Sequence, residues 1–178
     1  TGLLCARRLL TKLNLADTYK GNDNVDGEDY LVEEEEGPRP FYALLDVGLH
    51  RTTTGAKVFA AMKGACDGGI EIPHSPSRFV GFDDESDMLA PEVLRKYIFG
   101  GHVADFMRQL QEEDPARYQK QFAKYISASL GPDDLEDVYA KAHSAIRADP
   151  SFTPTTKKGK GQRWHEKKLT TAQRLEKA

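Results

Sequence analysis

The spacing of apolar residues predicts a helix at the very start of the chain. Apolar side chains recur there at every third or fourth position, which is the spacing of one helix face, and they are Leu3, Ala6, Leu10 and Leu13. Thr1 can cap this helix. We expect the basic residues between the apolar ones to face solvent, namely Arg7, Arg8 and Lys12.

A strand and a second helix are predicted next. Residues 41–47 (FYALLDV) form a nearly continuous apolar run, which is typical of a strand buried on both faces. Residues 54–66 have helical spacing and end at Gly68-Gly69, and residues 70–72 could add a short strand. Because one strand cannot form a sheet, we expect its partners in a segment that precedes this chain. Residues 20–40, with four acids in a row at 33–36, are predicted to be a solvated loop.

Beyond a turn-rich linker at residues 73–78 the pattern predicts only helices. They are expected to begin at Pro91, after Gly100-Gly101, at Asp114-Pro115 and at Pro132-Asp133-Asp134, since Pro and acids favour the first turn of a helix. We interpret their apolar stripes as core rather than as base-stacking platforms. The stripes comprise Val93, Leu94, Tyr97, Ile98, Val103, Phe106, Met107, Leu110, Tyr118, Phe122, Tyr125, Ile126, Leu135, Val138, Tyr139, Ala142 and Ile146.

The most distinctive chemistry lies in the polar loop before the second helix. Arg51 lies in this loop and Lys57 one turn inside the helix, and between them stand the hydroxyls of Thr52, Thr53 and Thr54. Any of these threonines could cap the helix, whose free N–H groups and dipole favour an anion. Hydroxyls beside cations suit phosphate oxygens, on a nucleotide or on a nucleic-acid backbone. The alternative is that the threonines only cap the helix and that Arg51 only lies in solvent.

The nucleotide interpretation fails on spacing. A P-loop needs four residues between its glycines and a hydroxyl after its lysine, whereas six residues separate Gly48 from Gly55 and Val58 follows Lys57. A backbone-phosphate site tolerates looser geometry and fits better. A phosphate-ester enzyme acting at this loop remains a remote third hypothesis.

No other constellation supports catalysis, a metal or a cofactor. Asp46, His50 and His74 could supply parts of a hydrolase site, but no Gly-x-Ser-x-Gly and no Cys beside a His is present. The acids at 83–87 lack the calcium-loop pattern. Cys5 and Cys66, without a Cys-x-x-Cys, are predicted to be small buried thiols. No apolar run approaches transmembrane length, so no membrane association is expected.

Charge is distributed unevenly along the chain. The net charge is −3, but residues 151–178 carry 8 basic and 2 acidic side chains, or +6, and residues 1–150 therefore carry −9. A basic tail on an acidic body is typical of an arm that binds polyanions. The alternative is a solubilising disordered tail.

Four segments carry a resemblance to a known family. They are residues 1–10 (TGLLCARRLL), 45–69, 97–103 (YIFGGHV) and 145–150 (AIRADP). They resemble the eukaryotic 5S-rRNA-binding proteins of the large ribosomal subunit, the family of large-subunit protein five, whose bacterial counterpart is protein eighteen. Residues 145–150 have the fungal style, and the resemblance runs over essentially the whole chain.

The resemblance implies a fold and a domain organisation. It implies an α/β (α+β) ribosomal-protein core, incomplete here, with residues 1–75 as its C-terminal part, 76–150 as an all-helical extension and 151–178 as a basic RNA-binding tail. Family members carry about a hundred further residues before this point, so the chain is expected to be a fragment that also lacks the end of the C-terminus.

The resemblance also implies a function. The chain would bind 5S rRNA and anchor the 5S ribonucleoprotein in the central protuberance. Its partners would be 5S rRNA, large-subunit rRNA, the eukaryotic large-subunit ribosomal protein eleven, and ribosome assembly and nuclear import factors. It would be cytoplasmic on the ribosome after a nuclear and nucleolar assembly phase. The alternative from another class is an acidic protein-interaction module with a basic localisation tail.

The candidate RNA-binding residues follow from the loop, the linker and the tail. They are Arg51, Thr52, Thr53, Thr54, Lys57, Lys63, His74, Arg78, Lys157, Lys158, Lys160, Arg163, Trp164, Lys167 and Lys168. Trp164 would stack on a base or, as an alternative of nearly equal weight, dock on a neighbouring protein.

Overall fold

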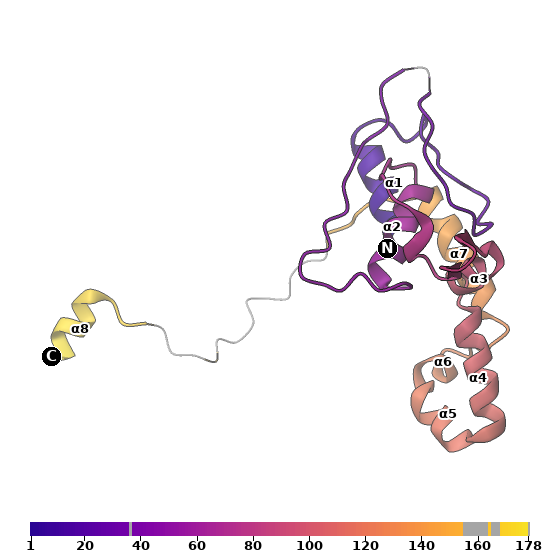
Figure 1. The fold of residues 1–178 in the computed structure, drawn as a ribbon. Helices are drawn as coiled ribbons and strands as arrows, with labels where there is room; N and C mark the ends of the chain where they lie inside the picture. Colours follow the sequence, from indigo (N-terminus) through magenta and orange to yellow (C-terminus); the bar gives the residue numbers. More distant parts are fainter. Residues whose placement is uncertain (36, 155–163, 165–167, 178) are drawn as a thin grey trace.

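The computed structural model describes residues 1–35, 37–154, 164 and 168–177. Their elements, in chain order, are α1 (Gly2–Lys12), α2 (Lys57–Asp67), the short 3-10 helix η1 (Pro76–Arg78), β1 (Phe82–Asp83), β2 (Met88–Leu89), α3 (Pro91–Ile98), α4 (Gly101–Glu113), α5 (Pro115–Gln121), α6 (Ala123–Ser127), α7 (Leu135–Ala148) and α8 (Thr171–Lys177) (Figure 1). The described chain is thus rich in helix with one small antiparallel sheet, which is compatible with the predicted α+β class.

The first of two packing units, which we call the body, is built on the crossing of α1 and α2. Gly2 permits the close approach, because a Cβ atom there would lie 1.8 Å from the carbonyl oxygen of Ala61. Ala6 and Leu10 are fully buried on the face of α1 that the sequence predicts, whereas Leu13 is exposed. The body core consists of Ala6, Phe59, Met62, Cys66, Ile70, Ile72, Phe79 and Leu94.

Arginine side chains join the loops of the body to its helices, contrary to the prediction that Arg7 and Arg8 face solvent. The Arg7 guanidinium donates hydrogen bonds to the carbonyls of Ala16 and Tyr19 at 2.8 Å. Arg8 donates to the carbonyl of Pro150 at 2.7 Å, and its guanidinium lies 5.2 Å from the ring centre of Phe152. Helical spacing alone could not show this, because the carbonyls that these arginines satisfy belong to irregular segments.

The predicted strand at residues 41–47 is not formed as such. Within the described residues only an isolated parallel bridge joins Tyr42 to Glu71, with Ala43 N donating to the Glu71 carbonyl at 2.9 Å. Tyr42 and Leu44 are 55% and 73% exposed, so this run is not buried on both faces. A strand extends only where a neighbouring backbone pairs with it, and residues 70–72 provide a single bridge. The described sheet is instead a short β1–β2 hairpin, in which Phe82 pairs with Leu89. The prediction of an all-helical extension at 76–150 is therefore wrong over this hairpin.

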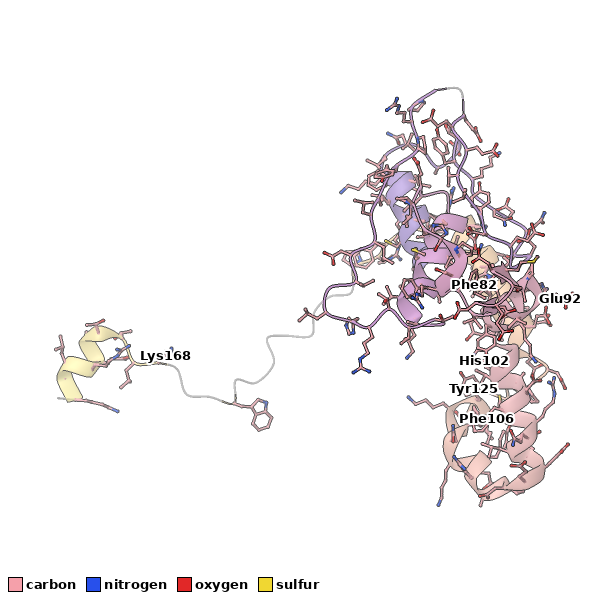
Figure 2. All side chains as sticks on the ribbon, viewed as in Figure 1. Phe82, Glu92, His102, Phe106, Tyr125 and Lys168 are labelled. Carbon is pink, nitrogen blue, oxygen red and sulfur yellow. The ribbon has the colours of Figure 1, made fainter. Side chains whose placement is uncertain are left out.

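The second packing unit, which we call the lobe, consists of α4, α5 and α6 and extends away from α1 and α2 (Figure 1). Met107 is fully buried in its core, together with Ala104, Leu110, Phe122 and Leu135. Around Phe122 lie the rings of Phe106, Tyr118 and Tyr125 at centroid distances of 5.5–6.1 Å. Figure 2 shows Phe106 and Tyr125 within the lobe. For these rings the prediction of core rather than of stacking platforms holds.

The long helix α7 connects the two units, and its apolar stripe is less buried than predicted. Leu135 at its start belongs to the lobe core, whereas Val138 and Tyr139 are 38% and 39% exposed. Ile126 in α6 is also exposed. The prediction that both cysteines are buried is wrong for Cys5, which is exposed on α1, and right for Cys66, which is buried. A periodic stripe identifies a helix face, but a neighbour must cover that face to make it core.

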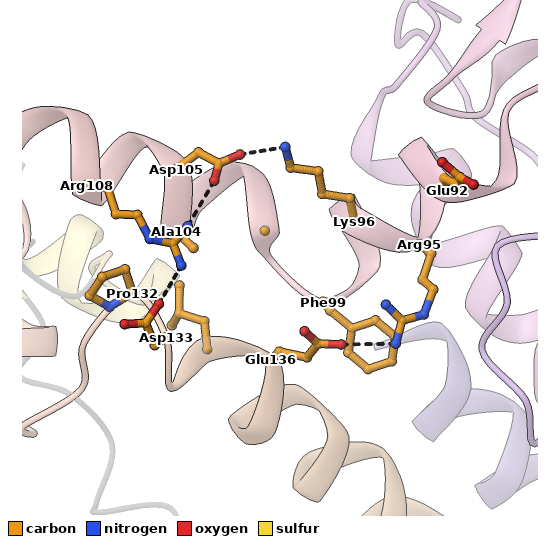
Figure 3. A pocket seen from close by; sticks show the side chains of 12 residues that line it. Glu92, Arg95, Lys96, Phe99, Ala104, Asp105, Arg108, Pro132, Asp133 and Glu136 are labelled. Carbon is orange, nitrogen blue, oxygen red and sulfur yellow. Dashed lines mark hydrogen bonds and ion pairs between the residues drawn. The ribbon is translucent and has the colours of Figure 1, made fainter.

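Ion pairs line a pocket of about 350 Å³ at the junction of α3, α4 and α7 (Figure 3). Asp105 accepts hydrogen bonds from Lys96 and Arg108, and these bonds lower the pKa of the carboxyl group below its usual value. Arg95 pairs with Glu136 at 3.0 Å. Because all these side chains are about half exposed and solvent screens them, each pair contributes little to stability.

Candidate nucleic-acid interface

The polar loop before α2 is braced by the linker that follows α2. Gly55 N donates a hydrogen bond to the Arg78 carbonyl at 3.0 Å. The Thr54 hydroxyl donates to the Ser77 carbonyl at 3.5 Å and accepts from the Arg78 guanidinium at 3.4 Å. Residues 24 positions apart in the chain are thereby brought together, and Arg78, a candidate from the linker, lies beside the loop.

The threonines do not cap the helix. Helix α2 begins at Lys57, its N-cap is Ala56, and no side chain caps it, so both the predicted start at residue 54 and the predicted threonine cap are wrong. The reason lies in the turn before the helix, where Ala56 N donates to the Thr53 carbonyl at 3.1 Å and Gly55 has a φ of 80°. This turn holds the threonines outside the first helical turn. The hydroxyls of Thr52 and Thr53 therefore remain exposed.

Three exposed cations surround this loop, namely Arg51, Lys57 and Arg78. No carboxylate pairs with any of them within the residues that the structure describes. Asp46, the acid just before the loop, instead accepts a hydrogen bond from Gly48 N at 2.8 Å. A cation without a fixed counterion attracts mobile anions. The first N–H groups of α2 add the positive end of the helix dipole at the same place.

Lys63 lies elsewhere. Its side chain is buried in the body and donates a hydrogen bond to the Asp67 carboxylate one turn along α2. Desolvation raises the pKa of Asp67 from its usual 3.8, and the positive charge of Lys63 opposes that shift. The ammonium group is therefore committed to an internal partner and does not share the exposed surface of Lys57.

His74 points inward as well. Its Nδ1 lies 2.6 Å from the Ile72 carbonyl, its Nε2 lies 3.0 Å from Asp29 Oδ1, and its ring meets the edge of Phe79. These contacts tie the acidic loop to the body core. Cys66 Sγ lies 3.9 Å from Nδ1, but burial raises the pKa of the thiol to about 12. A protonated thiol beside a nitrogen already bonded to a carbonyl does not form a catalytic pair.

Of the candidate RNA-binding residues in the tail, the structure describes Trp164 and Lys168. Trp164 is 89% exposed and Lys168 is exposed, which leaves both side chains free to contact a partner. The other candidates lie outside the described residues, namely Lys157, Lys158, Lys160, Arg163 and Lys167. Helix α8 (Thr171–Lys177) lies near the end of the chain, and none of its side chains is buried.

Two further classes of site are absent from the part of the chain that the structure describes. That part contains no group of three or more His, Cys, Asp and Glu side chains that could hold a metal ion. It also contains no helix with the length and apolarity that crossing a bilayer requires.

Comparison with known sequences identifies the class of protein. Residues 1–75 match the family model described as ribosomal large subunit proteins 60S L5 and 50S L18, and residues 135–178 match that of the ribosomal L18 C-terminal region. The class is therefore that of proteins of the large ribosomal subunit.

Individual relatives narrow the class to one family. The chain is 54% identical to large ribosomal subunit protein uL18 of Suberites domuncula over 98% of the chain and 60% of the relative. It is 56% identical to uL18 of Dunaliella salina over 92% of the chain and 60% of the relative. It is 55% identical to uL18 of Saccharomyces cerevisiae over 89% of the chain and 54% of the relative. The chain belongs to the uL18 family, and it spans about 60% of the length of such relatives.

Family membership decides two predictions of the sequence analysis. The resemblance to the large-subunit protein five and eighteen family is confirmed, with fungal proteins among the relatives. The prediction that the chain is not an enzyme is confirmed too, because the family is one of ribosomal structural proteins.

Proposed function

We propose that the chain is a structural constituent of the large ribosomal subunit that binds 5S rRNA and anchors the 5S ribonucleoprotein in the central protuberance. Membership of the uL18 family supports the ribosomal role. The observation that carries the RNA contact is the braced loop, where Arg51, Lys57 and Arg78 are exposed and without carboxylate partners in the described structure.

The chemistry of this loop suits the RNA backbone. When protein cations replace the counterions condensed on RNA phosphates, the release of those counterions favours binding. Hydroxyl groups can also donate hydrogen bonds to the phosphate oxygens. The brace between Thr54 and Arg78 fixes the loop before binding, so less conformational entropy is lost on association. Recognition would follow the shape of folded RNA and its 2′-hydroxyls rather than the base sequence of a duplex.

The contact set differs from the one predicted from sequence at two positions. Lys63 is paired with Asp67, and His74 is held by Ile72 and Asp29, so we assign them to the stability of the body. The tail residues that we proposed remain candidates, with Trp164 stacking on a base or docking on protein. On the ribosome they would add phosphate contacts to those of the loop.

The remaining partners follow from the same proposal. They are large-subunit rRNA, the eukaryotic large-subunit ribosomal protein eleven, and the assembly and nuclear import factors that carry the 5S particle. The protein would work on cytoplasmic ribosomes after a nuclear and nucleolar assembly phase.

The test is the salt dependence of binding to a 5S rRNA transcript. Arg51→Ala with Lys57→Ala should lower the slope of log K against log salt by roughly 1.4 to 1.8, since each lost phosphate contact removes about 0.7 to 0.9. The matched control is Lys12→Ala with Lys141→Ala, which removes the same charge from exposed positions on α1 and α7. Its slope should stay close to that of the parent chain.

Two results would contradict the proposal. An unchanged slope in the loop variant, with binding intact, would remove the loop from the interface. Absence of any RNA binding, together with salt-insensitive binding to a protein partner, would favour the acidic protein-interaction module instead.

A further inference from the structure

We propose that the lobe carries a second RNA-backbone contact, separate from the loop, formed by a cationic stripe of Arg117, Lys120 and Lys124. This inference rests on the proposed function, which supplies RNA as the polyanion. Neither the apolar spacing nor the family resemblance pointed to these residues. Their own spacing of three and four positions is the signal that could have done so.

The three side chains follow one another along α5 and α6, two helices joined by a single residue, Phe122. Phe122 lies between the two helices, yet its N–H donates to the Tyr118 carbonyl at 2.9 Å and its carbonyl accepts from Ile126 N at 3.0 Å. These bonds lead α5 into α6, although Phe122 itself has non-helical angles (φ −105°, ψ 21°) and the chain turns there. Arg117 and Lys120 lie one turn apart on α5, and Lys124 follows in the first turn of α6.

The opposite face of the same helices is turned into the lobe. Phe122 is buried in the lobe core, and Tyr118 and Tyr125 pack around it. The lobe core thus fixes the rotation of α5 and α6 about their axis and directs the stripe outward. Arg117, Lys120 and Lys124 are all exposed.

These cations differ from the others in and beside the lobe. Lys96 and Arg108 are engaged by Asp105, and Arg108 also by Asp133 (Figure 3). Within the described residues the stripe has no such partner, although residues 101–134 contain 6 acids and 4 bases. The nearest acids in sequence have other roles. Glu113 accepts from Gln109, and Asp114 caps α5 by accepting from Arg117 N at 3.0 Å.

The chemistry of the stripe favours RNA over an acidic protein. Protein interfaces depend on buried apolar or aromatic anchors within a polar rim. The positions on the stripe's face beside the cations are the exposed Gln121 and Ala128, which offer no such anchor. Binding to a phosphate backbone needs only cations and polar hydrogen-bond donors on the protein surface that faces it. The stripe meets that requirement and presents it on a rigid helical unit.

The test is a triple variant, Arg117→Gln, Lys120→Gln and Lys124→Gln, titrated with the 5S rRNA transcript. The slope of log K against log salt should fall by about 2, at roughly 0.7 for each lost contact. The control is Lys12→Gln, Lys20→Gln and Lys141→Gln, which makes the same change of net charge at scattered exposed positions. A fall in the slope of the stripe variant but not in that of the control supports a local contact.

Lysine acetylation measured by mass spectrometry gives a second readout on the unmodified chain. With the transcript bound, Lys120 and Lys124 should react at least several-fold more slowly, while Lys141 should react as before. The same experiment on Arg51→Ala with Lys57→Ala separates the two proposals, because protection of the stripe should persist when the loop contact is weakened.

Three results would overturn the inference. An unchanged slope in the stripe variant, with the loop variant still affected, would remove the stripe and leave the proposed function. Unprotected lysines in the bound state would do the same. Protection by polyglutamate but not by RNA would assign the stripe to an acidic protein.

Discussion

The body and the lobe use charged residues in opposite ways. In the body, cations enter the interior, where Arg7 and Arg147 hold backbone carbonyls and Lys63 pairs with Asp67. In the lobe, the interior is apolar and aromatic, and every charged side chain stays at the surface. The body is thus held by polar contacts between distant segments, whereas the lobe is held by the packing of residues close together in the chain.

This difference decides which cations can bind a polyanion. A buried cation that satisfies carbonyls or a carboxylate would leave those groups without partners if it turned outward. Such cations belong to the stability of the fold. Within the body and the lobe, the cations that we propose for RNA are therefore exposed ones, in the braced loop and in the lobe stripe. A count of net charge cannot distinguish them from the cations that hold the fold together.

The largest expected effect tests whether the lobe depends on its aromatic core. Phe122→Ala should destabilise the lobe by about 4 kcal/mol, because a large buried side chain is lost and a cavity remains. Hydrogen exchange measured residue by residue should show faster exchange over α4–α6. The amides of α1 and α2 should change little, because they belong to a different core.

The conservative variant Phe122→Leu serves as the control. It keeps an apolar side chain at the centre of the cluster, so its cost should be about half or less of that of Phe122→Ala. If α1 and α2 exchange as fast as the lobe in the alanine variant, the two units unfold together and the comparison between them fails.

The next effect tests the polar interior of the body. Arg147 donates to the Lys20 carbonyl at 2.9 Å and to the Asp67 carbonyl at 3.2 Å, and it pairs with Asp23 at 2.7 Å. Arg147→Met should therefore lower the free energy of unfolding by about 3 kcal/mol, since hydrogen bonds from a charged group are lost and the carbonyls of Lys20, Asn22 and Asp67 each lose one donor. Urea denaturation followed by far-UV circular dichroism measures this change.

Lys141→Met, on the exposed face of the same helix, provides the matched control. It should change stability by no more than about 0.5 kcal/mol. Equal effects of the two substitutions would mean that Arg147 contributes no more than a surface residue.

The features that could be predicted from the sequence are those set by residues close together in the chain. The helix predicted from the spacing of Leu3, Ala6 and Leu10 is present as α1 (Gly2–Lys12), because its apolar spacing agrees with its packing face. The lobe helices and the aromatic core followed from the same periodicity, with Pro91, Pro115 and the glycines at 100–101 marking the boundaries. The cations and hydroxyls of the loop were also visible, since they stand together in the chain.

What the sequence did not show depends on partners far away along the chain. The run at 41–47 has the composition of a strand but finds only Glu71 to pair with. Arg7 appeared to be solvent-facing because the carbonyls that it satisfies lie on irregular segments. The sequence places Lys63 among the RNA-binding candidates, because helical spacing does not show which face of α2 another segment covers. In the structure Lys63 is buried. The brace between Thr54 and Arg78 spans 24 positions and carries no motif.

The smallest expected effect concerns the pH dependence of stability, and it arises at His143 on α7, next to the polar interior of the body. His143 is half-buried, its Nδ1 is buried without a hydrogen-bond partner, and its ring lies 5.7 Å from that of Phe99. Desolvation, and then the charge of Arg147, lower the pKa of His143 below its ordinary value of 6.5. Folding therefore favours the neutral ring.

It follows that His143 supports the fold above pH 6.5 and that this support is lost as the pH falls through its lowered pKa. Unfolding free energies measured by urea denaturation between pH 7.5 and pH 5, in matched buffers, should fall more steeply for the parent chain than for His143→Phe. The difference should stay below about 1 kcal/mol, because the imidazole is partly exposed and solvent screens it. Arg147→Met should weaken this pH dependence, since it removes the second cause of the shift. Parallel pH profiles for the parent chain and His143→Phe would show that protonation of this ring is not linked to folding.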